Sequence, residues 1–144
     1  MNDATQGRFG LYISIINRAA QGFFYHRLKE YTIGPGQQAY LLSLLPDELI
    51  IQDELARRMQ VDKANVTRAL RSLENQGYIT RSKSYEDGRA WNIALTPEGI
   101  EIRTSIEAIA KEWLDHLKKP LSTEEWASLE DSLQRIAASL EDGR

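Results

Sequence analysis

The sequence predicts a mainly α-helical protein with one small β-hairpin. Apolar residues recur at helical spacing through most of the 144 residues, whereas strict alternation is confined to the short run Trp91, Ile93 and Leu95. An Asp-Gly pair at 87–88 precedes this run, and such a pair between two strand-like runs is typical of a hairpin, because the turn needs positive φ. The length suits one compact domain.

Residues 7–34 are apolar on more than one side. If this segment is a helix, one apolar stripe is formed by Phe9, Ile13, Ile16, Ala20 and Phe23. Three further apolar residues lie outside the stripe: Leu11, Ile15 and Phe24. A helix that is apolar nearly all round must be covered on several sides. In a chain of this length, a second copy of the chain is a natural cover.

A short helix is predicted next, over residues 37–45, between Gly34-Pro35-Gly36 and Pro46. The stretch 51–60 predicts the next helix, with Leu55, Ala56 and Met59 facing inward. Ile51 stands at the capping position and has no polar atom for a cap, so we expect Asp53 or water to serve the first amides.

The following segment predicts a second helix after a very short turn at residues 60–61. Asp62 is expected to cap a helix over residues 63–76, and Val66, Leu70 and Leu73 form its apolar stripe. Gly77 suits the left-handed position that ends a helix. Two helices with this short connection predict a helix-turn-helix.

Two strands and two further helices complete the chain. Residues 78–84 and 89–95 flank the hairpin turn, and Thr96 with Pro97 is expected to start a long helix. That helix has its inward positions at Ile102, Ile106, Ile109, Trp113 and Leu117, and it ends before Pro120. Ser122 and Glu125 predict a capping box for the last helix.

The last helix carries apolar residues at alternating spacings of three and four: Trp126, Leu129, Leu133, Ile136 and Leu140. This spacing is typical of a coiled-coil seam, although an ordinary core helix explains so short a run equally well. Together with the apolar first segment, it predicts dimerisation through both ends of the chain. The predicted organisation is residues 1–34 as an N-terminal dimerisation helix, 35–96 as a winged helix-turn-helix, and 97–144 as C-terminal dimerisation helices.

Positive charge is concentrated in one part of an acidic chain. The formal net charge is −3, yet residues 57–83 contain seven Lys or Arg and two Asp or Glu, a net charge of +5. A basic segment on an otherwise acidic protein predicts a local nucleic-acid surface.

The face of the second helix opposite its apolar stripe carries Lys63, Asn65, Thr67, Arg68, Arg71 and Ser72. In a major groove, Arg donates to guanine, Asn pairs with adenine, and the Thr methyl meets a thymine methyl. Arg57, Arg58 and Lys83 suit phosphate contacts, which set register without reading sequence. The alternatives are a solvated helix face, or a winged-helix module that binds protein and no DNA.

The chain resembles the MarR family of transcription regulators. The residues that carry the resemblance are "ELA" at 54–56, "VTRAL" and "LENQGYITR" over 66–81, Asp87-x-Arg89, and "LTPEG" at 95–99. The resemblance implies a homodimer on a pseudo-palindromic double-stranded DNA operator. Each recognition helix then lies in a major groove and each Arg89 in a flanking minor groove, with Asp87 holding Arg89 outward or bonding the turn backbone. It also implies a regulator, commonly a repressor, that a small aromatic acid or phenolic ligand releases.

An effector cleft is implied between the dimer helices and the DNA-binding lobe. Candidate lining residues are Arg18, which suits a carboxylate, His26 as a donor and Tyr40 for stacking. These three side chains are equally well explained as ordinary surface or core residues, since no spacing argument selects them.

Other function classes have little support in the sequence. The absence of cysteine excludes disulfides and thiol-based peroxide sensing. His26 and His116 form no metal-ligand pattern, no catalytic constellation is visible, and no apolar run is long enough for a bilayer. We therefore expect a cytoplasmic protein that is not an enzyme and uses no metal or cofactor.

Overall fold

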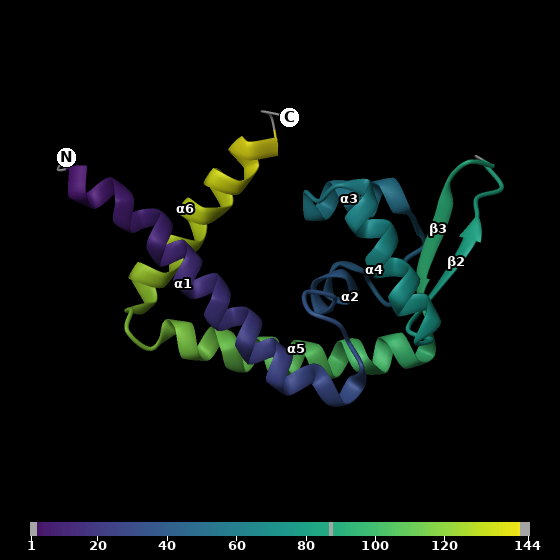
Figure 1. The fold of residues 1–144 in the computed structure, drawn as a ribbon, viewed down its shortest axis with the longest axis horizontal. Helices are drawn as coiled ribbons and strands as arrows, with labels where there is room; N and C mark the ends of the chain where they lie inside the picture. Colours follow the sequence, from purple (N-terminus) through teal and green to yellow (C-terminus); the bar gives the residue numbers. More distant parts are fainter. Residues whose placement is uncertain (1–2, 87, 142–144) are drawn as a thin grey trace. The chain divides into compact units, whose positions relative to one another are not determined.

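The computed structural model describes residues 3–86 and 88–141 (Figure 1). The chain forms two compact units, Met1–Ile109 and Ala110–Arg144. The first unit contains α1 (Asp3–Leu28), the 3-10 turn η1 (Lys29–Tyr31), α2 (Gln38–Ser43), β1 (Ile50–Ile51), α3 (Gln52–Met59), α4 (Lys63–Asn75), β2 (Ile79–Lys83) and β3 (Trp91–Leu95). Helix α5 (Pro97–Lys118) starts in the first unit and ends in the second, which also contains α6 (Thr123–Glu141). The mainly helical fold with a small sheet is thus confirmed.

Helix α1 joins the core of its unit only near its C-terminal end. Leu28 is buried there, and Phe23 and Phe24 pack against the core. Earlier in the helix, the large apolar side chains from Phe9 to Ile16 are exposed. None of the described helices is long and apolar enough to cross a membrane.

The core of the first unit lies under α4. Val66, Leu70 and Leu73 are fully buried, as the sequence predicts, and they join Leu55 of α3 and Ile93 of β3. The same core extends to α2 and to the first half of α5 through Leu41, Leu44, Ile102, Ile106 and Ile109. The cluster therefore ties the helix-turn-helix to the sheet and to the start of the long helix.

The turn between α3 and α4 is closed by backbone hydrogen bonds. Gln60 has a φ of 53°, and the amide of Val61 donates to the carbonyl of Ala56 at 3.2 Å. Asp62 then caps α4, since its Oδ1 accepts from the amide of Asn65 at 2.8 Å. No side-chain cap forms at Ile51, and Asp53 instead binds Lys63 at 3.2 Å.

Helix α4 ends in a Schellman motif. Gly77 has a φ of 82°, and the amides of Gly77 and Tyr78 donate to the carbonyls of Glu74 and Leu73, both at 3.0 Å. The left-handed role predicted for Gly77 is confirmed. The motif turns the chain directly into β2.

The sheet has three antiparallel strands in the order β1-β3-β2. The hairpin of β2 and β3 is confirmed, with Ile79 opposite Leu95 and Lys83 opposite Trp91. Strand β1 was not predicted, because a two-residue strand carries no alternation. Ile50 pairs with Ile93, so β1 anchors the start of α3 to the sheet.

The hairpin extends beyond the core, beside α4 in Figure 1. The amide of Ser84 donates to the carbonyl of Ala90 at 2.9 Å, and residues 85–89 lie beyond this bond. Asp87, expected to form the turn, lies outside the described residues. Trp91 lies on the strand face of Ile93 and Leu95, but it is 36% exposed, and the Arg81 guanidinium lies 4.9 Å from its ring centre.

Both predicted helix starts in the C-terminal part are confirmed. Thr96 Oγ1 accepts from the amide of Gly99 at 3.0 Å, and Pro97 is the first residue of α5. Ser122 and Glu125 form the reciprocal capping box at 3.1 and 2.7 Å. In the second unit, Lys118 lies over the ring of Trp126, and the rest of the α6 seam is exposed.

Gly99 occupies a position that only glycine fits. The residue is buried in the first turn of α5, and an added Cβ would overlap the carbonyl oxygen of Tyr78 and stand 2.9 Å from its carbonyl carbon. The same junction is held by Thr96, whose amide donates to that carbonyl at 3.1 Å. The glycine therefore lets α5 start against the chain that enters β2.

Replacing Gly99 with Ala should lower the free energy of unfolding by about 1–3 kcal/mol, since the clash is with backbone and not with a flexible side chain. Urea denaturation measures the change. Gly22→Ala is the matched control, because it is also helical but has no atom within 4 Å of the added Cβ. A Gly99 variant as stable as this control would contradict the steric role.

Candidate nucleic-acid interface

Helix α4 presents one polar face to solvent. Its buried side is fully occupied by Val66, Leu70 and Leu73, and the opposite side exposes Lys63, Asn65, Arg68 and Arg71. The N-terminal cap and the Schellman motif hold both helix ends. The backbone that carries these cationic and amide side chains is therefore fixed at both ends.

Thr67 differs from its neighbours on this helix. It is half-buried, its Oγ1 accepts from Gln52 Nε2 at 2.7 Å, and it donates to the carbonyl of Lys63 at 2.8 Å. The hydroxyl thus joins the start of α3 to α4. Sequence reasoning placed Thr67 among the groove residues and could not see this contact.

Asp62, Asn65 and Arg68 form a continuous hydrogen-bonded row. Asp62 Oδ2 accepts from Asn65 Nδ2 at 2.6 Å, and Asn65 Oδ1 accepts from Arg68 Nη2. Because the residues are three apart, they follow one another on the same side of the helix.

The two adjacent arginines of α3 have different surroundings. Arg57 is exposed and donates through Nε to Glu54 at 2.9 Å. Arg58 binds Glu48 through both terminal nitrogens and also donates to the carbonyl of Ser43 at 3.1 Å. Both arginines suggested for phosphate contacts are thus paired with a carboxylate, and the guanidinium of Arg58 also holds the loop after α2.

The hairpin adds further cations. Lys83 and Arg89 are exposed, Lys83 on β2 and Arg89 in the tip. Arg81 was not among the predicted site residues, yet it lies on the same side of β2 as Lys83 and stacks on Trp91. Its Nε and Nη1 are buried and make no hydrogen bond within the described part of the chain. The sequence offered one signal for this contact: Trp91 lies across the predicted hairpin from the strand that carries Arg81.

Comparison with known proteins agrees with this geometry. The family model described as "MarR family" matches residues 35–91. The HTH-type transcriptional regulator BilQ of Clostridioides difficile (strain CD3) is 31% identical over 109 residues, which cover 76% of this chain and 74% of BilQ. This chain belongs to the MarR family. It is a DNA-binding transcriptional regulator of the winged-helix type.

Solved structures of MarR-family proteins have the same fold. The crystal structure of the regulator SlyA superposes with a TM-score of 0.86 at 25% identity and covers 99% of this chain and 96% of its own. A mutant MarR from E. coli, solved with operator DNA, gives a TM-score of 0.79 at 25% identity, over 90% and 93% of the two chains. The predicted winged helix-turn-helix is thus confirmed.

A groove lies between α2 and α4 in the lobe of this MarR-family protein. It has a volume of about 580 Å³ and is lined by Tyr40, Val61, Asn65 and Arg68, among others. Burial raises the pKa of Tyr40, the Asp62 carboxylate raises it further, and the Arg68 guanidinium opposes this. Tyr40 is therefore close to the hydrogen-bonded row on α4.

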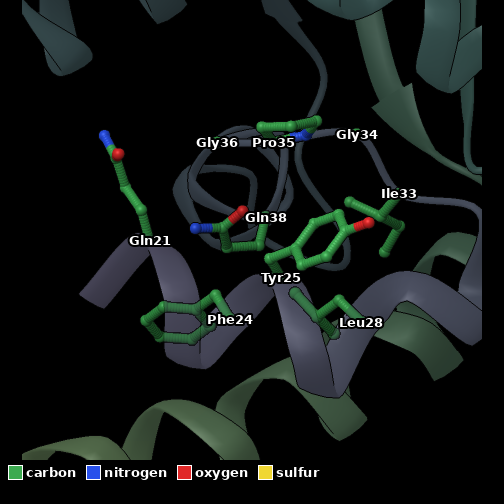
Figure 2. A pocket seen from close by; sticks show the side chains of 9 residues that line it. All are labelled: Gln21, Phe24, Tyr25, Leu28, Ile33, Gly34, Pro35, Gly36 and Gln38. Atoms are coloured by element: carbon green, nitrogen blue, oxygen red, sulfur yellow. The ribbon is translucent and has the colours of Figure 1, made fainter. Parts of the chain in front are cut away.

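A second pocket lies between the end of α1 and the loop before α2. Figure 2 shows the ring of Tyr25 extending from α1 toward Ile33 and Gly34, with Phe24 and Leu28 on either side of it on the helix. Its volume of about 20 Å³ suits one water molecule. Arg18 and His26 are exposed on α1 and line neither pocket, so the structure does not bring them together with Tyr40.

The contact of Glu48 with Arg58 predicts acid sensitivity of the DNA-binding lobe. The hydrogen bond from Arg58 holds the pKa of Glu48 below its usual range. Because the folded-state pKa is lowered, this stabilisation is present above the unfolded value of about 4.3 and is lost as pH falls through the folded value.

Glu48→Gln should therefore lower stability at pH 7, and the difference from wild type should shrink below about pH 4. Urea titrations between pH 3 and 7 measure it. Asp47→Asn, next in the loop and exposed, is the control for loss of one charge. A difference that stays constant down to pH 3 would contradict an ionic origin.

Proposed function

We propose that this MarR-family protein binds a pseudo-palindromic double-stranded DNA operator as a homodimer and represses transcription. The observation that carries the proposal is the basic polar face of α4, held rigid at both ends in an otherwise acidic chain. An α-helix of this kind fits the major groove, where arginine reads guanine. The E. coli MarR structure with operator DNA gives this use of the fold a precedent. Such a role requires access to the chromosome, hence a cytoplasmic location.

The residues divide by the contact that we propose for each. Arg68 reads a base, and Arg71 lies one turn further along the same face. Lys63, Arg57 and Lys83 contact phosphates, while Arg89 enters the flanking minor groove, where a narrow groove attracts arginine. Asp87 is proposed to steady Arg89.

A homodimer is supported by unpaired apolar surface at both ends of the chain. Large apolar side chains of α1 are exposed, and Leu129, Leu133, Ile136 and Leu140 form an exposed seam on α6. Contiguous exposed apolar surface of this kind marks a protein interface. We propose that a second copy covers both surfaces.

We further propose release of DNA by a small aromatic acid or phenol. Of the residues named for this role, Tyr40 lines the groove on α4, where a ligand has room. The pocket beside Tyr25 must widen to admit an aromatic ring, because its volume suits water. An effector of either kind must bind the DNA-free state more tightly than the DNA-bound state.

The DNA contacts predict different behaviour for two cationic residues. Arg68→Ala should weaken operator binding by about 1–3 kcal/mol and relax preference at one position. Lys83→Ala should weaken binding equally on all sequences and lower the slope against log salt by about 1. Operator selection from random DNA, followed by anisotropy titrations across a salt series, measures both.

Wild-type binding that is indifferent to DNA sequence and to salt would reject the proposed function, since phosphate neutralisation requires a steep salt slope. It would favour the alternative of a protein-binding module.

The dimer proposal predicts that a charge in the α6 seam separates the subunits. Leu133→Glu should shift the protein toward monomer by about tenfold or more in dissociation constant, because a carboxylate would be buried without a partner. Sedimentation equilibrium measures the change. Gln134→Glu adds the same charge next to the seam and should remain dimeric; equal behaviour of the two variants would contradict an interface at the seam.

A further inference from the structure

The hydrogen bonds that join Asp62, Asn65 and Arg68 can form in only one direction along the row. A carboxylate only accepts and a guanidinium only donates, so an amide between them must turn its NH2 toward Asp62 and its oxygen toward Arg68. Asn65 therefore transmits the position of the Asp62 carboxylate to the Arg68 guanidinium. The amide orientation follows from the chemistry of its two neighbours.

Capping alone does not account for Asp62. Its Oδ1 caps the helix by accepting from the backbone amide of Asn65 at 2.8 Å, and Ser, Thr or Asn cap a helix comparably well. The second oxygen accepts from the Asn65 side chain at 2.6 Å. Only a carboxylate accepts both bonds from one residue with two separate oxygens. A negative charge near DNA phosphates is unfavourable for binding. The Asp62 carboxylate must therefore contribute something to binding that offsets this repulsion.

We propose that Asp62 and Asn65 are positioning residues that aim Arg68 at one base of the operator. This rests on the proposed DNA-binding function and revises one part of it: Asn65 uses its amide to hold Arg68 and does not itself read adenine. One N–H of Arg68 is committed to Asn65, and the other donors remain for a guanine edge. A guanidinium that is already held loses less conformational entropy on binding.

The inference names Asp62 as a specificity residue although it is acidic and need not touch DNA. Removing it relieves repulsion from phosphates, so simple electrostatics predicts tighter binding to every sequence. Loss of the positioning predicts weaker binding to the operator only. The two effects have opposite signs on operator DNA, which makes the substitution informative.

Asp62→Asn is the decisive variant. Its Oδ1 still caps α4, but an NH2 replaces the oxygen that faced Asn65. Asn65 must then turn its own oxygen toward residue 62 and its NH2 toward Arg68. The Asn65 NH2 and the Arg68 guanidinium are both donors, so the bond between them is lost. The matched control is Glu74→Gln, which removes one negative charge from the same helix, and whose side chain makes no hydrogen bond in the part of the chain that the structure describes.

The first measurement compares the selected operator with unrelated DNA. Asp62→Asn should lower the ratio of the two affinities by about tenfold, the scale of one specific base contact, and relax preference at the position that Arg68→Ala relaxes. Glu74→Gln should keep the wild-type ratio. Adding Arg68→Ala to Asp62→Asn should cause little further loss. An unchanged ratio in Asp62→Asn, or relaxation at a different position, would overturn the proposal.

The second measurement needs no DNA. The ¹⁵N relaxation of the Arg68 Nε–H group should report an ordered side chain in the wild type and in Glu74→Gln, and a mobile one in Asp62→Asn. Equal mobility in all three would overturn the positioning role even if the protein binds its operator. Absence of any sequence preference in the wild type would instead reject the proposed function, while an ordered Arg68 would leave the hydrogen-bonded row intact as a structural feature.

Discussion

The burial of Val66, Leu70 and Leu73 determines what α4 offers to a partner. These side chains are fully enclosed between α3 and the sheet, so the helix cannot rotate about its axis without exposing them. At about 25 cal/mol per Å² of apolar surface, such a rotation is strongly unfavourable. The polar face is therefore fixed by the core beneath it, and the turn at Gln60 and Val61 fixes the start of the helix.

The cations of this surface also differ in what they hold within the lobe. Arg58 is engaged by Glu48 and a backbone carbonyl, whereas Arg68 donates one bond to an amide within the part of the chain that the structure describes. The net charge of residues 57–83 does not distinguish Arg58 from Arg68, because each contributes one positive charge. Their surroundings show that one stabilises the lobe and the other faces outward, as a recognition residue must.

Local chemistry made most of the fold predictable. The caps at Asp62, Thr96 and Ser122 and the left-handed Gly77 depend on a few adjacent residues, and all four are present. Strand β1 escaped prediction because two residues carry no pattern. Alternation placed Trp91 with Ile93 and Leu95, yet it does not reveal that the hairpin extends beyond the core. The role of Gly99 required knowing which backbone segment lies beside it.

The sequence by itself determined the helices, the hairpin, the basic segment and the family, since periodicity, capping and motifs are encoded in neighbouring residues. Only the tertiary structure decided which polar side chains are free and which are engaged. The reason is that hydrogen bonds such as Arg58 to Glu48, or Gln52 to Thr67, join residues ten and fifteen positions apart that only the folded chain brings together. The hydrogen-bonded row from Asp62 to Arg68 is local in sequence. It faces solvent, where DNA can reach it, because the opposite side of α4 is buried in the core.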